Sequence, residues 1–451
     1  MSSDLTSAPI PQLVRRLAIP AGTGFIFTTM FNVVDVWYGG RLSTTALAAM
    51  SLCFPVFFII LAIGSGVSSA ATALIGNALG RNEIDESQIY LLQSFSFTLI
   101  HALLLTVAGL YLSPFIFKLM GANGEYLSYA LSYMNVIFAG STFFLLNYVM
   151  NAILNAHGNT IAYRNFLIIG CLLNLLLDPW LMYGGLGIPS LGLPGIALAT
   201  VIIQCMGNFY LFRQLSKSGA LKLFRMNELW PRWTYFMEMF KQGFPSAMNM
   251  MTVSLGIFII TWYVGRFGEH AVAAYGIGTR IEQIVLLPVM GLNISTLALT
   301  AQNFGAGRID RIRKTLHVSL KWGVAIAVAG SLASLFFSRE LIGVFTNDNN
   351  VTEIGARFLS IEAFTFPSYV LLYICISAMQ GIKMPIFGLI IGLYRQVAGP
   401  FVVFHLLAVV LGLGLTGIWW GILGITWSAA LVVVIYVNRT LVKLEKDSET
   451  I

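Results

Sequence analysis

Two acidic residues stand alone in long apolar stretches of the chain. Asp35 lies in the segment 18–37 between two valines, and Asp178 lies in the segment 167–183. A carboxylate at membrane depth costs about 3 kcal/mol or more, so such residues usually face a cavity or a partner and mark proton or ion sites. The pair therefore predicts an ion-coupling site in a transporter.

Asn174 precedes Asp178 by four residues, which places the two side chains on one face of a helix. Its amide can donate a hydrogen bond to an ionised carboxylate. Burial in a low dielectric favours the neutral form of a carboxyl group. An acid held between these two influences can exchange protons near neutral pH, whereas an exposed aspartate cannot. The alternative for Asn174 and Asp178 is a hydrogen bond that only joins helices.

Other polar side chains in apolar stretches are candidates for the same pocket. For each of them, a hydrogen bond between helices explains the residue as well as a function does. They are Asn32, Tyr133, Asn151, Thr200 and Gln204. The four cysteines also lie in apolar runs without metal-ligand spacing, so we expect neither a metal site nor a disulfide.

Pro20 lies about four turns before Asp35 in the same predicted helix. Proline removes one backbone hydrogen bond and favours a kink. Because Pro20 stands on the helix that carries the acid, we expect it to act as a hinge; the alternative is a purely structural kink.

The composition of the chain indicates that these residues lie in membrane-spanning segments. Hydrophobic residues make up 57% of the chain and charged residues 10%, against roughly 25% charged residues in soluble domains. Apolar stretches of about 20 residues predict membrane-spanning helices. We therefore expect an all-α integral membrane protein with twelve spans: 13–38, 47–76, 87–113, 126–150, 160–184, 193–214, 238–264, 271–302, 315–337, 353–380, 384–412 and 415–438.

Basic residues predict the orientation of these spans. Of the 26 lysines and arginines, 19 fall on one side and five on the other. The positive-inside rule then places both termini in the cytoplasm of a multi-pass protein, which we expect in a bacterial inner membrane. The net charge of +7 is explained by topology, so no nucleic-acid partner is expected.

The chain also contains an internal repeat. Trp37-Tyr-Gly-Gly-Arg41 returns 225 residues later as Trp262-Tyr-Val-Gly-Arg266, and Pro20 returns as Pro245. An even number of spans in each half gives parallel repeats related by an axis along the membrane normal. We expect two six-helix lobes with pseudo-two-fold symmetry around a central cleft, over residues 1–214 and 236–451, joined by a cytoplasmic linker over residues 215–235.

The motifs together resemble the multidrug and toxin extrusion (MATE) family. They are Asp35-Val-Trp-Tyr-Gly-Gly-Arg41, Ala46-Leu-Ala-Ala49, Gly76-Asn-Ala-Leu-Gly-Arg81 with its repeat at Gln302–Arg308, and Asp178-Pro179. The resemblance implies secondary antiport of amphipathic, often cationic, drugs by alternating access in exchange for protons or sodium ions. It also implies pocket roles for Tyr133 and Thr200.

Within that family the chain resembles the DinF-like branch. The helix after Pro245 has no acid, and neither has the stretch around Tyr369. The resemblance therefore implies coupling in the amino-terminal half. We expect H⁺ as the coupling ion, with Na⁺ as the alternative, and no organic cofactor; membrane lipids surround the chain, which we expect to act as a monomer.

Two rival functions remain. A lipid-linked precursor flippase of the same superfamily needs a basic cavity, but only Arg280 and Arg395 lie deep inside predicted spans, away from the span ends. An enzyme needs a catalytic constellation, and no paired histidines, nucleophile elbow or phosphate-binding loop is found. Arg280 and Glu282 are expected to have a structural role, either near a membrane surface or in pairs with other helices, through Glu362 or Arg395.

Overall fold

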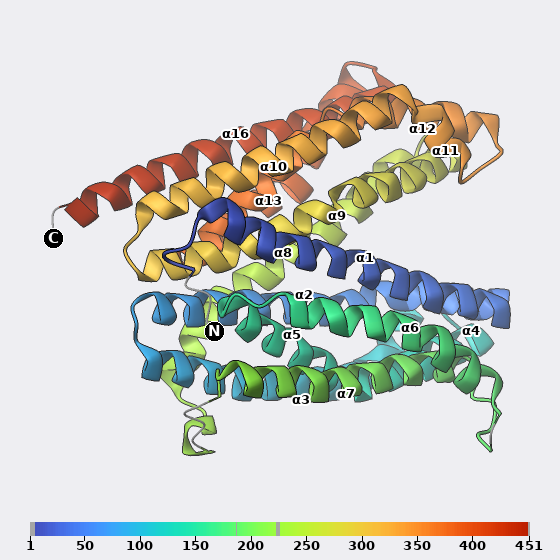
Figure 1. The fold of residues 1–451 in the computed structure, drawn as a ribbon. Coiled ribbons are helices and arrows are strands. Elements are labelled where there is room, and N and C mark those ends of the chain that lie inside the picture. Colours follow the sequence, from blue (N-terminus) through green and yellow to red (C-terminus); the bar gives the residue numbers. More distant parts are fainter. Residues whose placement is uncertain (1–4, 186, 222–225, 450–451) are drawn as a thin grey trace. The chain divides into compact units, whose positions relative to one another are not determined.

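A computed structural model describes residues 5–185, 187–221 and 226–449. Within these residues the secondary structure is helical, apart from one isolated bridge between Gly185 and Ile188. Figure 1 shows the helices coloured along the sequence, from blue at the start to red at the end. The first half of the chain forms α1 (Ile10–Leu42), α2 (Thr44–Gly80), α3 (Ile84–Leu119), α4 (Gly124–Ala139), α5 (Ser141–Ala156), α6 (Ile161–Tyr183) and α7 (Leu193–Ser218).

The second half repeats this order. It contains η1 (Met226–Leu229), α8 (Trp233–Gly265), α9 (Glu269–Gly305), α10 (Ile309–Phe336), α11 (Ser338–Gly343), α12 (Asn349–Glu362), α13 (Phe366–Gly381), α14 (Ile386–Leu393), η2 (Tyr394–Ala398), α15 (Gly399–Phe404), η3 (His405–Val410) and α16 (Gly414–Glu449). The run from α14 to η3 is one span, in which η2 and η3 are π-helical.

Among the described residues, ten helices are long and apolar enough to cross a membrane, and two bent helix pairs bring the number of spans to twelve. Each falls on a predicted stretch, so the all-α class is confirmed. Backbone polar groups in lipid have no water to bond, and only a helix satisfies them all within one segment.

The sequence did not predict that the fourth and tenth spans are broken. α4 and α5 meet at a bend of 47°, and α12 and α13 at a bend of 52°. Gly140 occupies the first break and residues 363–365 the second, which is the same position in each repeat. The breaks are therefore part of the duplicated design.

The described residues divide into two compact units. Unit 1 is Thr23–Ala247 and unit 2 is Leu5–Gly22 together with Met248 onwards. The division differs from the predicted lobes 1–214 and 236–451 because the start of α1 belongs to unit 2 and the start of α8 belongs to unit 1. The two crossing points, after Gly22 and after Ala247, are again 225 residues apart.

We call the exchanged segments the first arm (Leu5–Gly22) and the second arm (Trp233–Ala247). Glycines let the backbone of each arm pack directly against the backbone of the unit to which it belongs. A Cβ atom added to Gly291 of α9 would lie 2.2 Å from the Ala18 carbonyl oxygen, and one added to Gly66 of α2 would lie 2.6 Å from the Gly243 carbonyl oxygen. These contacts too are 225 residues apart, so the exchange of arms is repeated with the fold.

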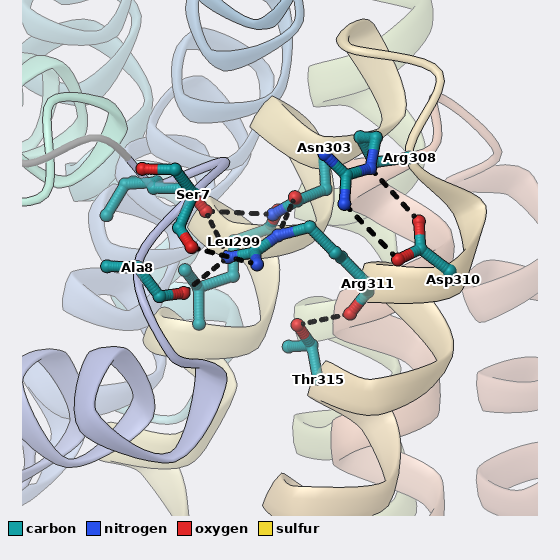
Figure 2. Close-up of polar contacts among 9 residues, drawn as sticks. Ser7, Ala8, Leu299, Asn303, Arg308, Asp310, Arg311 and Thr315 are labelled. Carbon is teal, nitrogen blue, oxygen red and sulfur yellow. Dashed lines mark hydrogen bonds and ion pairs between the residues drawn. The ribbon is translucent and has the colours of Figure 1, made fainter.

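Polar side chains hold the start of the first arm (Figure 2). The buried Arg311 guanidinium donates to the carbonyl oxygens of Ala8 at 2.7 Å and Leu5 at 3.2 Å, and its Nε donates to Asn303 at 2.8 Å. Asn303 donates in turn to the carbonyl oxygens of Leu5 and Leu299. Asn303 lies in the repeated motif Gln302–Arg308, so this motif anchors the start of the first arm.

The chain that leads into the second arm is held in a similar way by α3. Gln88 donates to the Ala220 carbonyl oxygen at 2.6 Å, and Gln93 donates to that of Trp230 at 2.9 Å. The predicted linker 215–235 is thus bonded to unit 1 at both described ends.

Packing within each unit follows one pattern. In unit 1, α2 packs on α3, α4 and α5, and α7 packs on α4, α5 and α6. In unit 2, α9 packs on α10, α12 and α13, and α16 packs on α12, α13 and α15. The helices correspond in repeat order, which agrees with the predicted duplication.

The structure explains the glycines of a further repeated motif, which reads Gly192-Leu-Pro-Gly195 in the first half and Gly414-Leu-Thr-Gly417 in the second. Gly192 and Gly414 have φ values of 60° and 58°, which glycine adopts without strain. A Cβ atom on Gly195 would lie 2.6 Å from the Leu181 carbonyl oxygen. The first glycine makes the turn and the second lets two spans pack closely.

We expect Gly417→Ala to destabilise the protein by about 1–3 kcal/mol, because its Cβ would lie 2.8 Å from the Leu407 carbonyl carbon. Gly424→Ala on the same helix is the control, since a Cβ there meets no atom within 4 Å. Thermal unfolding of purified protein is the measurement. Equal melting temperatures for the two variants would contradict the packing role of Gly417.

Candidate functional site

The two isolated acids meet in unit 1. Asp35 comes from α1 and Asp178 from α6, and their side chains are 6% and 0% exposed. Asn174 lies between them: its amide nitrogen is 2.9 Å from the Asp35 Oδ1 atom and 2.8 Å from the Asp178 Oδ1 atom. The two N–H groups of one buried amide thus serve both carboxyl groups.

α7 adds a donor to Asp35. The Thr200 hydroxyl lies 3.3 Å from Asp35 Oδ2 and also 3.2 Å from the Ile196 carbonyl oxygen. Within the described residues, Asp178 Oδ2 and Asn174 Oδ1 have no hydrogen-bond partner. Two carboxylates that share one site repel each other, and burial opposes the ionised state of both. This arrangement favours a site that holds at least one proton and can exchange it.

Tyr133 lies next to this group. It is buried on α4, and the Asp35 carboxyl group is close enough to act on it electrostatically. Of the two residues for which the resemblance implied pocket roles, Thr200 therefore bonds to Asp35, and Tyr133 lies within electrostatic range of it.

The remaining predicted residues lie outside the hydrogen-bonded group. Asn32 is exposed, and its amide donates to the Thr28 carbonyl oxygen on its own helix. Gln204 accepts from Asn147 at 2.7 Å. Asn151 is buried on α5, beyond the break in the fourth span.

Pro20 is buried in the first arm, so it belongs to unit 2 although it shares α1 with Asp35. The helix runs without interruption from Ile10 to Leu42. Pro20 lies three residues before Thr23, where α1 passes into unit 1.

Sequence reasoning missed two residues near the site. The Tyr38 hydroxyl donates to the Leu175 carbonyl oxygen at 3.1 Å and joins α1 to α6 one turn from Asp35. Asn147 orients Gln204. Asn147 is a lone amide in an apolar stretch, which is the signal that singled out the other candidates.

The tryptophan and arginine of the repeated motif form cation–π pairs. The Arg41 guanidinium lies 4.6 Å from the centre of the Trp37 ring, and Arg266 lies 4.0 Å from that of Trp262. The pairs occur at the end of α1 and just beyond α8, where an amphipathic contact suits a membrane surface.

No group of three histidine, cysteine, aspartate or glutamate side chains in the described part of the chain is arranged to hold a metal ion. Oxygen atoms of the two acids and Thr200 suit either a proton or a hard monovalent cation.

A twelve-span helical protein with a buried pair of carboxyl groups has the features of a secondary transporter. Comparison with known proteins agrees. The MatE family profile matches residues 20–180 and again 245–405, at the interval of the internal repeat. The chain belongs to the MatE family, whose members are secondary transporters and not enzymes.

Relatives of known designation match most of the chain. The FAD transporter of Shewanella oneidensis is 28% identical over 400 residues, which cover 87% of both chains. The probable multidrug resistance protein YoeA of Bacillus subtilis is 25% identical over 357 residues, or 77% of this chain and 76% of YoeA. The outward-facing structure of a multidrug resistance MATE family transporter of the MOP superfamily has the same fold, with a TM-score of 0.90 over 98% of both chains at 23% identity.

We expect Asn174→Ala to destabilise the protein by about 1–3 kcal/mol, because both buried carboxyl groups lose their shared donor. Asn32→Ala is the control, since that amide is exposed and bonds only within α1. The measurement is the midpoint of thermal unfolding in detergent. A drop in Asn32→Ala as large as that in Asn174→Ala would refute this account.

Proposed function

We propose that this chain is a proton-coupled multidrug antiporter, with the coupling acids in the amino-terminal half. The observation that supports the proposal is the Asn174 amide shared by Asp35 and Asp178 in unit 1. Relatives designated a probable multidrug resistance protein and a multidrug export protein support drugs as the substrate class. The expected substrates are amphipathic and often cationic.

The geometry suggests how coupling would work. Asn174 and Thr200 donate to Asp35 and favour its ionised form, whereas burial favours its neutral form. A small change in the surroundings can then add or remove a proton. A cationic drug near an ionised Asp35 is attracted, and a proton on Asp35 removes that attraction. Linkage requires the antagonism between drug and proton to be reciprocal.

Sodium is the alternative coupling ion, because two carboxyl groups and a hydroxyl also offer oxygen ligands. The lipid-linked flippase stays the weaker alternative, since the acids and not a basic cluster occupy the buried site of unit 1. FAD belongs among the substrates to be tested, because the relative from Shewanella oneidensis is designated an FAD transporter.

Further parts of the proposal follow from the architecture. Two parallel repeats suit alternating access, and a single chain that carries both repeats suits a monomer. The distribution of basic residues supports a cytoplasmic location for both termini, and the bacterial relatives support a bacterial inner membrane.

The test is drug-induced proton release from purified protein in sodium-free liposomes. Wild type should exchange a cationic dye for protons, whereas Asp35→Asn should lose this exchange and stay folded, because a neutral amide is cheaper to bury than a charge. Asp178→Asn should be impaired to a lesser degree. Asp310→Asn, an exposed acid on α10, is the control.

Full exchange by Asp35→Asn would remove Asp35 from the coupling site. Exchange by wild type that requires sodium would replace the proton by Na⁺. Absence of any exchange, together with unchanged drug tolerance of an efflux-deficient bacterium that carries the protein in its membrane, would refute multidrug export.

Pro20→Ala should weaken transport more than drug binding. The substitution lets residue 20 donate a backbone hydrogen bond within α1, which stiffens the helix close to the point where it passes between units. Pro114→Ala is the control, because Pro114 lies inside α3, a helix that contains neither crossing point. The measurement is the transport rate beside the dissociation constant of the same dye, and an equal loss in both would contradict the hinge.

A further inference from the structure

Unit 2 contains a second cluster of acidic residues, which the coupling site does not use. Glu362 lies at the end of α12, Glu282 on α9 and Arg395 in the π-helical segment η2. Tyr369 of α13 joins them: its hydroxyl lies 3.2 Å from Glu362 Oε1, and the Arg395 guanidinium carbon lies 5.1 Å from the centre of its ring. The cluster thus combines four elements that are far apart in the sequence.

Glu362 is the residue that lacks an explanation in packing. Its side chain is 1% exposed, and within the described residues its Oε2 atom has no hydrogen-bond partner. The backbone of the break beside it is satisfied, because Trp427 donates to the Phe364 carbonyl oxygen and Ser331 to that of Ala363. Other side chains therefore satisfy these two carbonyl groups of the break, and the Glu362 carboxyl group is not needed to bond them.

The break itself points to a binding site. In transporters, ion and substrate sites are typically formed where a spanning helix is interrupted. The tenth span bends by 52° directly after Glu362. The π-helical turn that carries Arg395 is a second irregularity of a kind found mainly at functional sites.

The position of this turn is set by close packing. Next to Arg395, the Gln396 side chain fills a space at Gly256 of α8, where an added Cβ would lie 1.9 Å from Gln396 Oε1. Glycine at this position lets η2 approach α8. The helix irregularity is therefore a fixed feature that places Arg395 against Tyr369.

The cluster extends from buried to half-buried residues of unit 2. Glu282 and Arg395 are half-buried, whereas Glu362 and Tyr369 are buried. Glu282 lies close enough to Tyr369 and Arg395 for direct electrostatic interaction. The Tyr369 hydroxyl links Glu362 to Glu282: when its oxygen takes the proton of Glu362, it gives its own proton to the Glu282 carboxylate, so that one proton leaves Glu362 and one reaches Glu282.

This cluster is not a copy of the site in unit 1. The residue 225 positions after Asp35 is Ile260, and the positions that correspond to Asp178 are apolar. The acids of unit 2 therefore arise at positions outside the repeat pattern.

We propose that Glu362 is a second proton-binding site of this protein, which carries its proton inside unit 2 and exchanges it through Tyr369 with Glu282 at the half-buried end. The charges of the cluster, two carboxyl groups and one guanidinium group, support this proposal. Arg395 balances one of the two carboxylates, and an isolated second charge would be costly to bury. Glu362 is neutral in the resting cluster, and its proton leaves only when another positive charge enters. The site does not depend on the role proposed for Asp35.

Five titratable or charged groups face Glu362. They are Tyr275 and Glu282 from α9, Tyr369 and Tyr373 from α13, and Arg395 from η2. The experiment must therefore separate Glu362 from these groups.

Infrared spectroscopy of the full-length protein detects a protonated carboxyl group directly. The Asp35→Asn/Asp178→Asn variant removes the site of unit 1, and at about pH 7 exposed carboxyl groups are ionised. We expect one carbonyl band of a protonated acid to remain and to shift in D₂O. Adding Glu362→Gln should abolish this band, whereas adding Glu353→Gln, an exposed residue on the same helix, should leave it unchanged.

Two further variants keep the test decisive. Tyr369→Phe should shift the frequency of the band without removing it, because the hydroxyl no longer donates to Glu362. If Glu362→Gln does not fold, Glu362→Asp must move the band. A missing band in the starting variant, or a band unaffected by changes at Glu362, would overturn the proposal, and a band lost in Glu282→Gln alone would reassign the proton. None of these outcomes depends on transport of a drug.

Discussion

The interaction on which the site in unit 1 depends is the bond of one amide to two acids. Asn174 offers two N–H groups, and they reach Asp35 and Asp178 at nearly equal distances. Without this donor, two acids would lie in a low dielectric with only Thr200 beside them. The amide also ties α1 to α6, so a change in the charge of Asp35 acts directly on the packing of these helices.

The duplicated fold carries a different set of polar and acidic side chains in each unit. Both halves share the crossing points, the broken fourth and tenth spans, and the glycines at the close helix contacts. The acids do not follow the repeat, since Asp35 corresponds to Ile260. The two units share their backbone geometry but not their polar residues. The binding properties of one unit can therefore change while the helix arrangement within each unit stays the same.

The spans, the repeat and the isolated acids Asp35 and Asp178 could be recognised from the sequence, because each of them leaves a local pattern in it. Hydrophobic length marks a span, and a lone carboxylate such as Asp178 marks a site. The exchange of arms left no such signal, because Ala18 and Gly291 meet only through the fold. Pairing of Gln204 with Asn147 escaped prediction for the same reason: an amide in a span shows that a partner exists but not which one.

The exchanged arms set an order on the assembly of the chain. Residues Leu5–Gly22 are synthesised first, yet their contacts with Gly291 and Arg311 require α9 and α10, about two-thirds of the way along the sequence. The first arm therefore reaches its packing partners only after α9 and α10 have been made. Unit 1 is likewise complete only after the second arm, which comes from the next repeat, has been made. If translation stops after α7, the first arm has no partners and unit 1 lacks the second arm, so a fragment with only the first six spans would be an incomplete folding unit.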